Sequence, residues 1–171
     1  NEGVKHLKGE MEEETFNTTM DLNVDAYIPD SYIPNEYQKL DIYKRVAAIE
    51  NEEEMEDMLE ELIDRFGDIP KKVETLLAVA SLKAIAHSAY VTAVEQKGER
   101  FTFSMYEKAK VQPQKIPGLL EQFKGDLAFK ADAENPCFLY EKKSRNKKEK
   151  NTDVLAVVKN VLIGIKGLID Q

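Results

Sequence analysis

Hydrophobic residues in the first half of the chain recur every three or four positions, which predicts three successive helices. The first helix is expected over residues 35–49, with two adjoining apolar rows. The second carries one continuous apolar stripe over residues 55–66 and ends at Gly67, where a left-handed cap favours glycine. The third spans about residues 70–89 and is apolar around most of its girth, which is typical of a central helix. The two rows of the first helix are Leu40, Tyr43 and Ala47, and Ile42, Val46 and Ile49.

Alternation of apolar and polar residues predicts strands on both sides of this helical region. Residues 22–28 alternate as a half-buried strand does. After the third helix, residues 91–96 and 100–106 predict a hairpin with a turn at Lys97-Gly98. Residues 127–131 and 137–140 predict a second hairpin.

Two further helices complete the order of elements. A short helix follows Pro117, and a final helix is expected from about Thr152, whose hydroxyl suits an N-cap, to Ile169. The resulting order, β-α-α-α-β-β-α-β-β-α, predicts an α+β fold with a mainly antiparallel sheet and helices packed on it. Residues 1–20 are interpreted as an acidic and polar linker tail and residues 21–171 as one domain. An interior boundary near Tyr90 is the alternative, although neither half carries a rich core of its own.

Composition narrows the class of protein. The 171 residues carry 24 basic and 32 acidic side chains, a net charge of −8, which opposes general binding to nucleic acid. No apolar run approaches the roughly 20 residues of a membrane span, so no membrane partner is expected. One cysteine, Cys137, cannot form an internal disulfide, which favours a reducing, cytoplasmic compartment. The chain starts at Asn1 rather than at methionine, so we expect a piece of a longer protein.

The residues that usually carry catalysis are scarce and scattered. His6 lies in the tail, His87 lies near the end of the third helix, and Cys137 lies in a predicted strand. Their separation matches no zinc motif, and Gly164 and Gly167 lack the Lys-Ser/Thr pair of a phosphate-binding loop. No catalytic, cofactor or metal site is therefore predicted. A small hydrolase or transferase would need a pocket where glutamate, His87 and Cys137 converge.

An acidic row runs along the second helix. Residues 50–64 hold nine acidic and no basic side chains. Glu54, Asp57, Glu61 and Asp64 are spaced 3, 4 and 3 apart and share one flank of the helix, away from the apolar stripe. Two interpretations follow, namely a solvated helix face or a docking surface for a basic partner.

A basic segment lies near the other end of the chain. Six lysines and arginines fall between Lys142 and Lys150. Such a cluster contacts nucleic acid in some proteins, but it lacks the interleaved aromatic residues that stack on bases. A solvated loop is the favoured interpretation, and a nucleic-acid-binding module that uses Lys142–Lys150 is the alternative function.

Three stretches carry a family resemblance. They are Asp-Ala-Tyr-Ile-Pro-Asp-Ser-Tyr-Ile at 25–33, Gln-Lys-Leu-Asp-Ile-Tyr-Lys-Arg at 38–45, and Glu-Leu-Ile-Asp-Arg-Phe-Gly at 61–67 followed by Ile69-Pro70. Together they resemble the C-terminal (TRCF) domain of the bacterial transcription-repair coupling factor, Mfd. The specific motifs lie within about residues 20–90, while residues 91–171 fit in length and element order only.

The resemblance implies a parent protein that translocates on DNA by ATP hydrolysis, removes stalled RNA polymerase and recruits nucleotide excision repair through UvrA. ATP, magnesium, DNA and RNA polymerase would bind other domains of that parent. This domain is implied to be non-catalytic and autoinhibitory. It would dock on the UvrB-like module of its own chain and mask the surface that binds UvrA.

The matching positions for intramolecular docking are Glu61, Asp64 and Arg65 of the third stretch. Glu54 and Asp57 share the acidic flank but lie outside the motif, so they are weaker candidates. The remaining motif residues are interpreted as structural. Those at the entry of the first helix are Tyr27, Pro29 and Tyr32, and those at the corner between the second and third helices are Phe66, Gly67 and Pro70.

Overall fold

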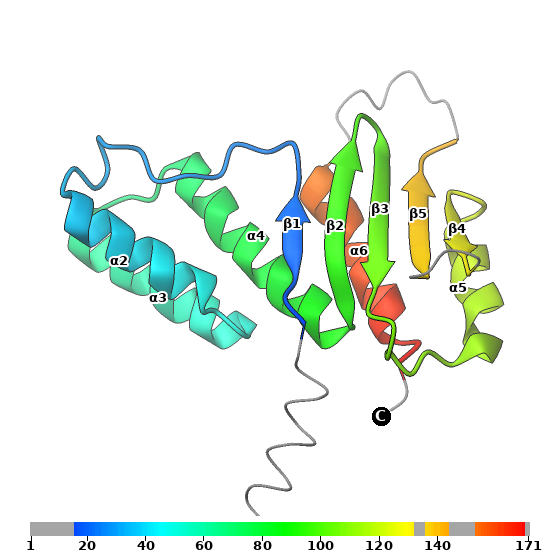
Figure 1. The fold of residues 1–171 in the computed structure, drawn as a ribbon. Coiled ribbons are helices and arrows are strands. Elements are labelled where there is room, and N and C mark those ends of the chain that lie inside the picture. Colours follow the sequence, from blue (N-terminus) through cyan, green and yellow to red (C-terminus); the bar gives the residue numbers. More distant parts are fainter. Residues whose placement is uncertain (1–15, 132–135, 144–152, 170–171) are drawn as a thin grey trace, which may run out of the picture.

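The helices and strands follow one another in the predicted order. The computed structural model describes residues 16–131, 136–143 and 153–169. The fold is α+β, as predicted (Figure 1). The elements are β1 (Thr19–Asp21), α2 (Glu36–Ala47), α3 (Glu52–Phe66), α4 (Lys71–Ser88), β2 (Val91–Lys97), β3 (Arg100–Met105), the short 3-10 helix η1 (Pro113–Lys115), α5 (Ile116–Gln122), β4 (Leu127–Lys130), β5 (Cys137–Glu141) and α6 (Val154–Lys166).

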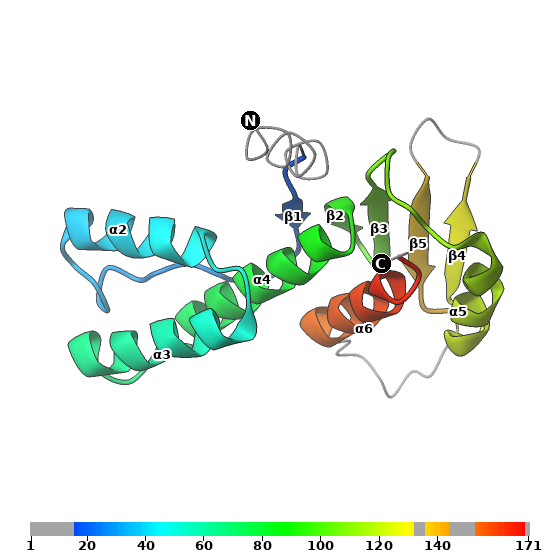
Figure 2. The same ribbon diagram turned by 90° about the horizontal axis from the view of Figure 1, so that it is seen from below.

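Five strands form one mixed sheet in the order β1-β2-β3-β5-β4. Only β1 pairs in parallel, with β2, and the other three pairings are antiparallel. A row of apolar side chains, Val94, Phe103, Phe138 and Phe129, crosses four strands in register, and the first three are fully buried. Figure 2 shows α4 and α6 lying on the same face of the sheet. Alternation along the strands therefore directs one set of side chains to these helices.

Two hydrophobic cores share the long helix α4. Val73 and Leu77, in its first half, belong to a core with α2 and α3. Leu82 and Ala86, in its second half, belong to the core beneath the sheet. We call residues 28–77 the helical arm, which stands beside the sheet in Figure 1. The cores divide within α4, upstream of Tyr90, and this shared use explains why α4 is apolar around most of its girth.

The strand predicted at residues 22–28 is wrong, because the only pairing in this region is that of β1, three residues earlier. Exposure does alternate along 22–28, ending at buried Ile28. An extended connection that lies on the protein has the same period as a strand, whether or not it joins a sheet ladder. Two of the three residues of β1, Thr19 and Met20, also fall inside the stretch interpreted as tail. Thr18 beside them donates its hydroxyl to the carbonyl of Val91 at 2.7 Å.

Only one of the two predicted apolar rows of α2 is fully buried, and in the other row only Tyr43 is half-buried against the arm core. Ile42, Val46 and Ile49 enter the arm core, whereas Leu40 keeps 56% of its surface exposed. Ala47, in the same row as Leu40, is exposed as well. The arm is only three helices wide, so α2 contacts neighbours on one side alone.

The ends of two helices refine the predicted caps. Gly67 ends α3 with φ +92° and ψ −162°, a positive φ that favours glycine but lies outside the left-handed helical region. Its N–H donates to the carbonyl of Ile63 at 3.0 Å. At the start of α6 the N-cap is Asp153, whose carboxylate accepts from the N–H of Ala156, and not Thr152, which lies outside the described residues.

Candidate functional site

The acidic row on α3 begins with a cap. Asn51 accepts a hydrogen bond from the N–H of Glu54 at 2.8 Å. The carboxylate of Glu54 in turn accepts from the N–H of Glu50 at 2.8 Å. The first hydrogen bond satisfies the N–H of Glu54, which has no partner inside the helix, and the second ties the connection before the helix to its first turn. Glu54 therefore has a structural role in starting α3.

Glu61 is held between two arginines. Arg45, from α2, donates Nη1 to Oε2 at 2.6 Å and Nη2 to Oε1 at 2.5 Å. Arg65, one turn along α3, donates to Oε2 at 2.9 Å. These hydrogen bonds hold the pKa of Glu61 well below its usual range, at about 2. The Glu61 carboxylate is thus already neutralised inside the arm.

Arg45 is a residue that the sequence analysis did not single out. It closes the motif at 38–45, and it also lies 4.0 Å from Asp41 on its own helix. Arg45 lies in the last turn of α2, where the helix dipole favours a basic residue in any case. Its position in the sequence therefore did not indicate an ion pair with α3. Its membership of a family motif was the signal available.

Asp57 and Asp64 lie on the same flank of α3 and are exposed. Within the described residues, neither forms an ion pair. Arg65 is engaged by Glu61, and its guanidinium lies 4.9 Å from the centre of the Phe66 ring. Of the predicted docking residues, Asp64 and Asp57 therefore offer exposed carboxylates to a partner, and the docking role of all of them stays a prediction.

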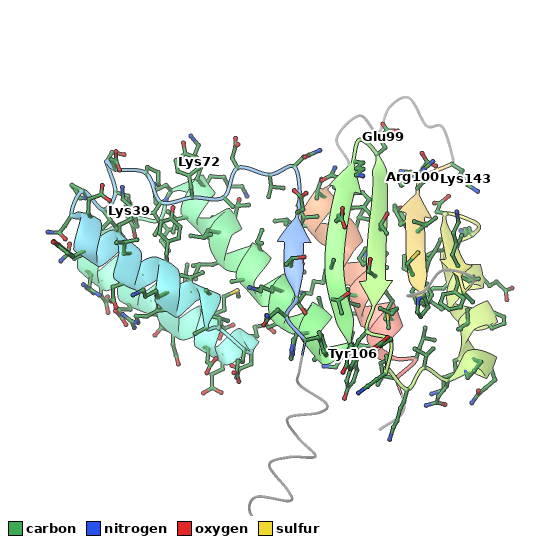
Figure 3. All side chains as sticks on the ribbon, viewed as in Figure 1. Lys39, Lys72, Glu99, Arg100, Tyr106 and Lys143 are labelled. Atoms are coloured by element: carbon green, nitrogen blue, oxygen red, sulfur yellow. The ribbon has the colours of Figure 1, made fainter. Side chains whose placement is uncertain are left out.

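The other motif residues tie the arm together. The Tyr32 hydroxyl shares its proton between the carbonyls of Gly67 at 2.9 Å and Leu62 at 3.1 Å. Burial, together with nearby Asp68, raises the pKa of Tyr32. Two lysines labelled in Figure 3 add links from the connection before α2, since Lys39 pairs with Asp30 and Lys72 donates to the Tyr27 hydroxyl at 2.7 Å. These contacts place α3 in a defined position relative to α2 and α4.

His87 and Cys137 do not meet in a pocket. His87, on α4, stacks on Phe16 with ring centres 4.4 Å apart, and its Nε2 lies 3.1 Å from the Phe16 carbonyl. Phe16 also stacks on Tyr106 at 4.6 Å. Cys137 lies half-buried on β5, a different element. These contacts give His87 a structural role in holding Phe16 against α4.

The described part of the basic segment lies among acidic groups. Figure 3 shows Glu99, Arg100 and Lys143 at the same end of the sheet. Arg100 lies 3.5 Å from Glu141, and the N–H of Lys143 donates to Asp126 at 3.0 Å. Residues 144–150 of the segment lie outside the described residues.

A groove of about 700 Å³ lies between α5 and α6. Its lining includes Leu119, Phe123 and Ile163, together with Lys115 as an ionisable residue. Across residues 16–131, 136–143 and 153–169, no three His, Cys, Asp or Glu side chains gather as metal ligands would. Of the helices in those ranges, none combines the length and hydrophobicity that a bilayer crossing needs.

The helical arm, α4 and the hairpin of β2 and β3 together define a known class of domain. The model of the TRCF domain family matches residues 22–116, more than half of the chain, so the chain belongs to this family. All three motif stretches lie inside the match.

Proteins named transcription-repair-coupling factor are similar in sequence to most of this chain. It is 40% identical to the transcription-repair-coupling factor of Staphylococcus haemolyticus over 131 residues, which cover 75% of this chain and 10% of that protein. It is 32% identical to the Bacillus subtilis protein of the same name over 163 residues, which cover 94% of this chain and 14% of that protein. The chain therefore spans only a small part of these relatives' length.

A solved structure shares the fold. The crystal structure of the C-terminal domain of a transcription-repair coupling factor superposes with a TM-score of 0.65 and 26% sequence identity. The match covers 88% of this chain and 95% of that one. The shared fold thus extends beyond residue 116, where the family match ends.

Proposed function

We propose that this chain is the C-terminal regulatory domain of a transcription-repair coupling factor and that it acts by binding rather than by catalysis. It docks through the exposed flank of α3 on the UvrB-like module of its own parent protein and masks the surface that binds UvrA. The observation that carries the proposal is Asp64, an exposed carboxylate in the family motif that forms no ion pair within the described residues.

The charge arrangement suits docking on a basic surface. Glu61 is saturated by Arg45 and Arg65, so Asp64 and the neighbouring Asp57 are the groups that gain from a new cationic partner. A single exposed ion pair contributes only about 0–1 kcal/mol, but charges of one sign along a helix orient a partner and reject wrong ones. The tightly linked arm presents them from a rigid helix, which limits the entropy lost on binding.

The parent's own chemistry is part of the proposal. ATP with magnesium, DNA and stalled RNA polymerase would be handled by domains outside this chain. Releasing the docked domain would then expose the UvrA-binding surface.

The test is a calorimetric titration of this chain against the isolated UvrB-like module. Asp64→Lys reverses an exposed charge and leaves Arg45, Glu61 and Arg65 in the chain, so it should weaken binding by about tenfold or more. Glu121→Lys on α5 makes the same change in net charge on an exposed residue outside the helical arm, and this variant should bind like the wild type. Unchanged affinity of the Asp64→Lys variant would rule out this surface.

In the full-length parent protein, Asp64→Lys should increase UvrA binding. ATPase or DNA-binding activity should rise as well if the docked domain restrains the motor. UvrA binding that stays at the wild-type level would contradict the masking role.

A further inference from the structure

We propose that the docking surface continues from α3 onto the outward face of α2, where Tyr37 and Leu40 act as apolar anchors. The partner surface must then present an apolar patch beside its basic residues. This inference rests on the proposed function and adds to it the chemistry of the contact.

The two anchors are the most exposed large apolar residues of α2. Tyr37 keeps 86% of its surface exposed and Leu40 keeps 56%. They lie three positions apart on one helix, so their side chains are neighbours. The arm core takes Ile42, Val46 and Ile49 from α2, so Tyr37 and Leu40 contribute little to folding. A hydrophobic row that the core leaves uncovered is a feature of binding sites.

The apolar anchors on α2 are connected to the acidic row on α3 through Asp41 and Arg45. Tyr37, Asp41 and Arg45 follow one another at intervals of four, which places them in one row along α2. Arg45 then crosses to Glu61 on α3 through two hydrogen bonds. Asp64 lies three positions beyond Glu61 on α3. One partner can therefore contact the anchors and the acidic row together.

Charge decides what kind of partner covers this surface. Residues 35–66 carry eleven acidic and four basic side chains, a net charge of −7, against −8 for the whole chain. A second copy would bring two such arms together, and nucleic acid or an anionic lipid would bring further negative charge. A protein surface with lysines and arginines around an apolar patch is the complementary partner.

The acidic row and the apolar anchors are expected to contribute to binding in different ways. The acidic row sets orientation and is weakened by salt, because exposed charges are screened within about 10 Å at ordinary ionic strength. The apolar anchors are not screened in this way. Interface anchors that become buried commonly account for a tenfold or greater share of affinity, and aromatic residues are frequent among them.

The experiment titrates the double variant Tyr37→Gln, Leu40→Gln against the isolated UvrB-like module. Glutamine keeps helix propensity and removes the apolar surface. Binding should weaken by about tenfold, with the thermal unfolding temperature unchanged because both positions are exposed. Ile163→Gln is the matched control, since Ile163 is 51% exposed on α6, outside the helical arm, and its variant should bind like the wild type.

The outcomes separate the two proposals. If Asp64→Lys abolishes binding and Tyr37→Gln, Leu40→Gln leaves it unchanged, the apolar extension is wrong while the proposed function stands. If Asp64→Lys has no effect, the proposed function fails and this inference fails with it. Sedimentation of this chain as a dimer that the double variant disrupts would assign the α2 face to a second copy and overturn the inference.

Discussion

We expect the bridge from Arg45 and Arg65 to Glu61 to stabilise the helical arm by an amount that unfolding experiments can measure. Glu61→Gln keeps the side-chain shape but removes the charge, and it leaves two guanidinium groups without their shared counter-ion. Taken at face value, the lowering of the Glu61 pKa from 4.5 to about 2 corresponds to about 3 kcal/mol. The side chain is 32% exposed, so solvent screening reduces the expected loss to about 1 kcal/mol.

Urea unfolding of the wild type, Glu61→Gln, Arg45→Gln and the double variant gives the interaction energy directly. We expect a coupling of about 0.5–1 kcal/mol between Arg45 and Glu61 at low salt, and less at high salt. A coupling indistinguishable from zero would mean that solvent competes fully with the bridge, and the reasoning from its geometry would be refuted.

The same bridge has a defined pH dependence. Because the pKa of Glu61 is lower in the folded state, its contribution is complete above about pH 4.5 and is lost as the pH falls toward about 2. The stability difference between the wild type and Glu61→Gln should therefore shrink over this window. A difference that stays constant from neutral pH to pH 2 would show that it does not arise from the carboxylate charge.

Three further predictions concern the framework around the site. Gly67→Ala should cost about 1–3 kcal/mol in urea unfolding, because φ of +92° strains any residue with a Cβ, and an unchanged midpoint would contradict this. Tyr32→Phe removes the hydroxyl that bridges to the end of α3, and we expect a loss of about 1 kcal/mol by the same measurement, with equal stability as the contrary result. Phe16 is stacked between His87 and Tyr106, so Phe16→Ala should accelerate amide hydrogen exchange of β1 about tenfold, whereas unaltered exchange would show that the stacking does not secure this strand.

The elements that could be read from sequence are those with a strong local period. The stripe from Met55 to Phe66 and the stop at Gly67 predicted α3, because amphipathic spacing and a glycine terminator are properties of neighbouring residues. The hairpin of β2 and β3 was predicted for the same reason. Residues 22–28 show what local periodicity cannot predict. Their alternation indicates an extended backbone, whereas pairing into a sheet depends on a partner strand about 70 residues away.

The acidic site also has one feature that the local sequence predicts and one that depends on distant contacts. Placing Glu61 and Asp64 on one flank of α3 needs only the helical period, so the sequence was sufficient. The pairing of Glu61 depends on Arg45, sixteen positions away on another helix, whereas Asp64 forms no ion pair within the described residues. Likewise both apolar rows of α2 fit a buried helix face equally well, and only the packing of the arm selects Ile42 and leaves Leu40 exposed. Local periodicity specifies which side chains share a face, whereas contacts between distant segments decide which face is buried and which charges are left for a partner.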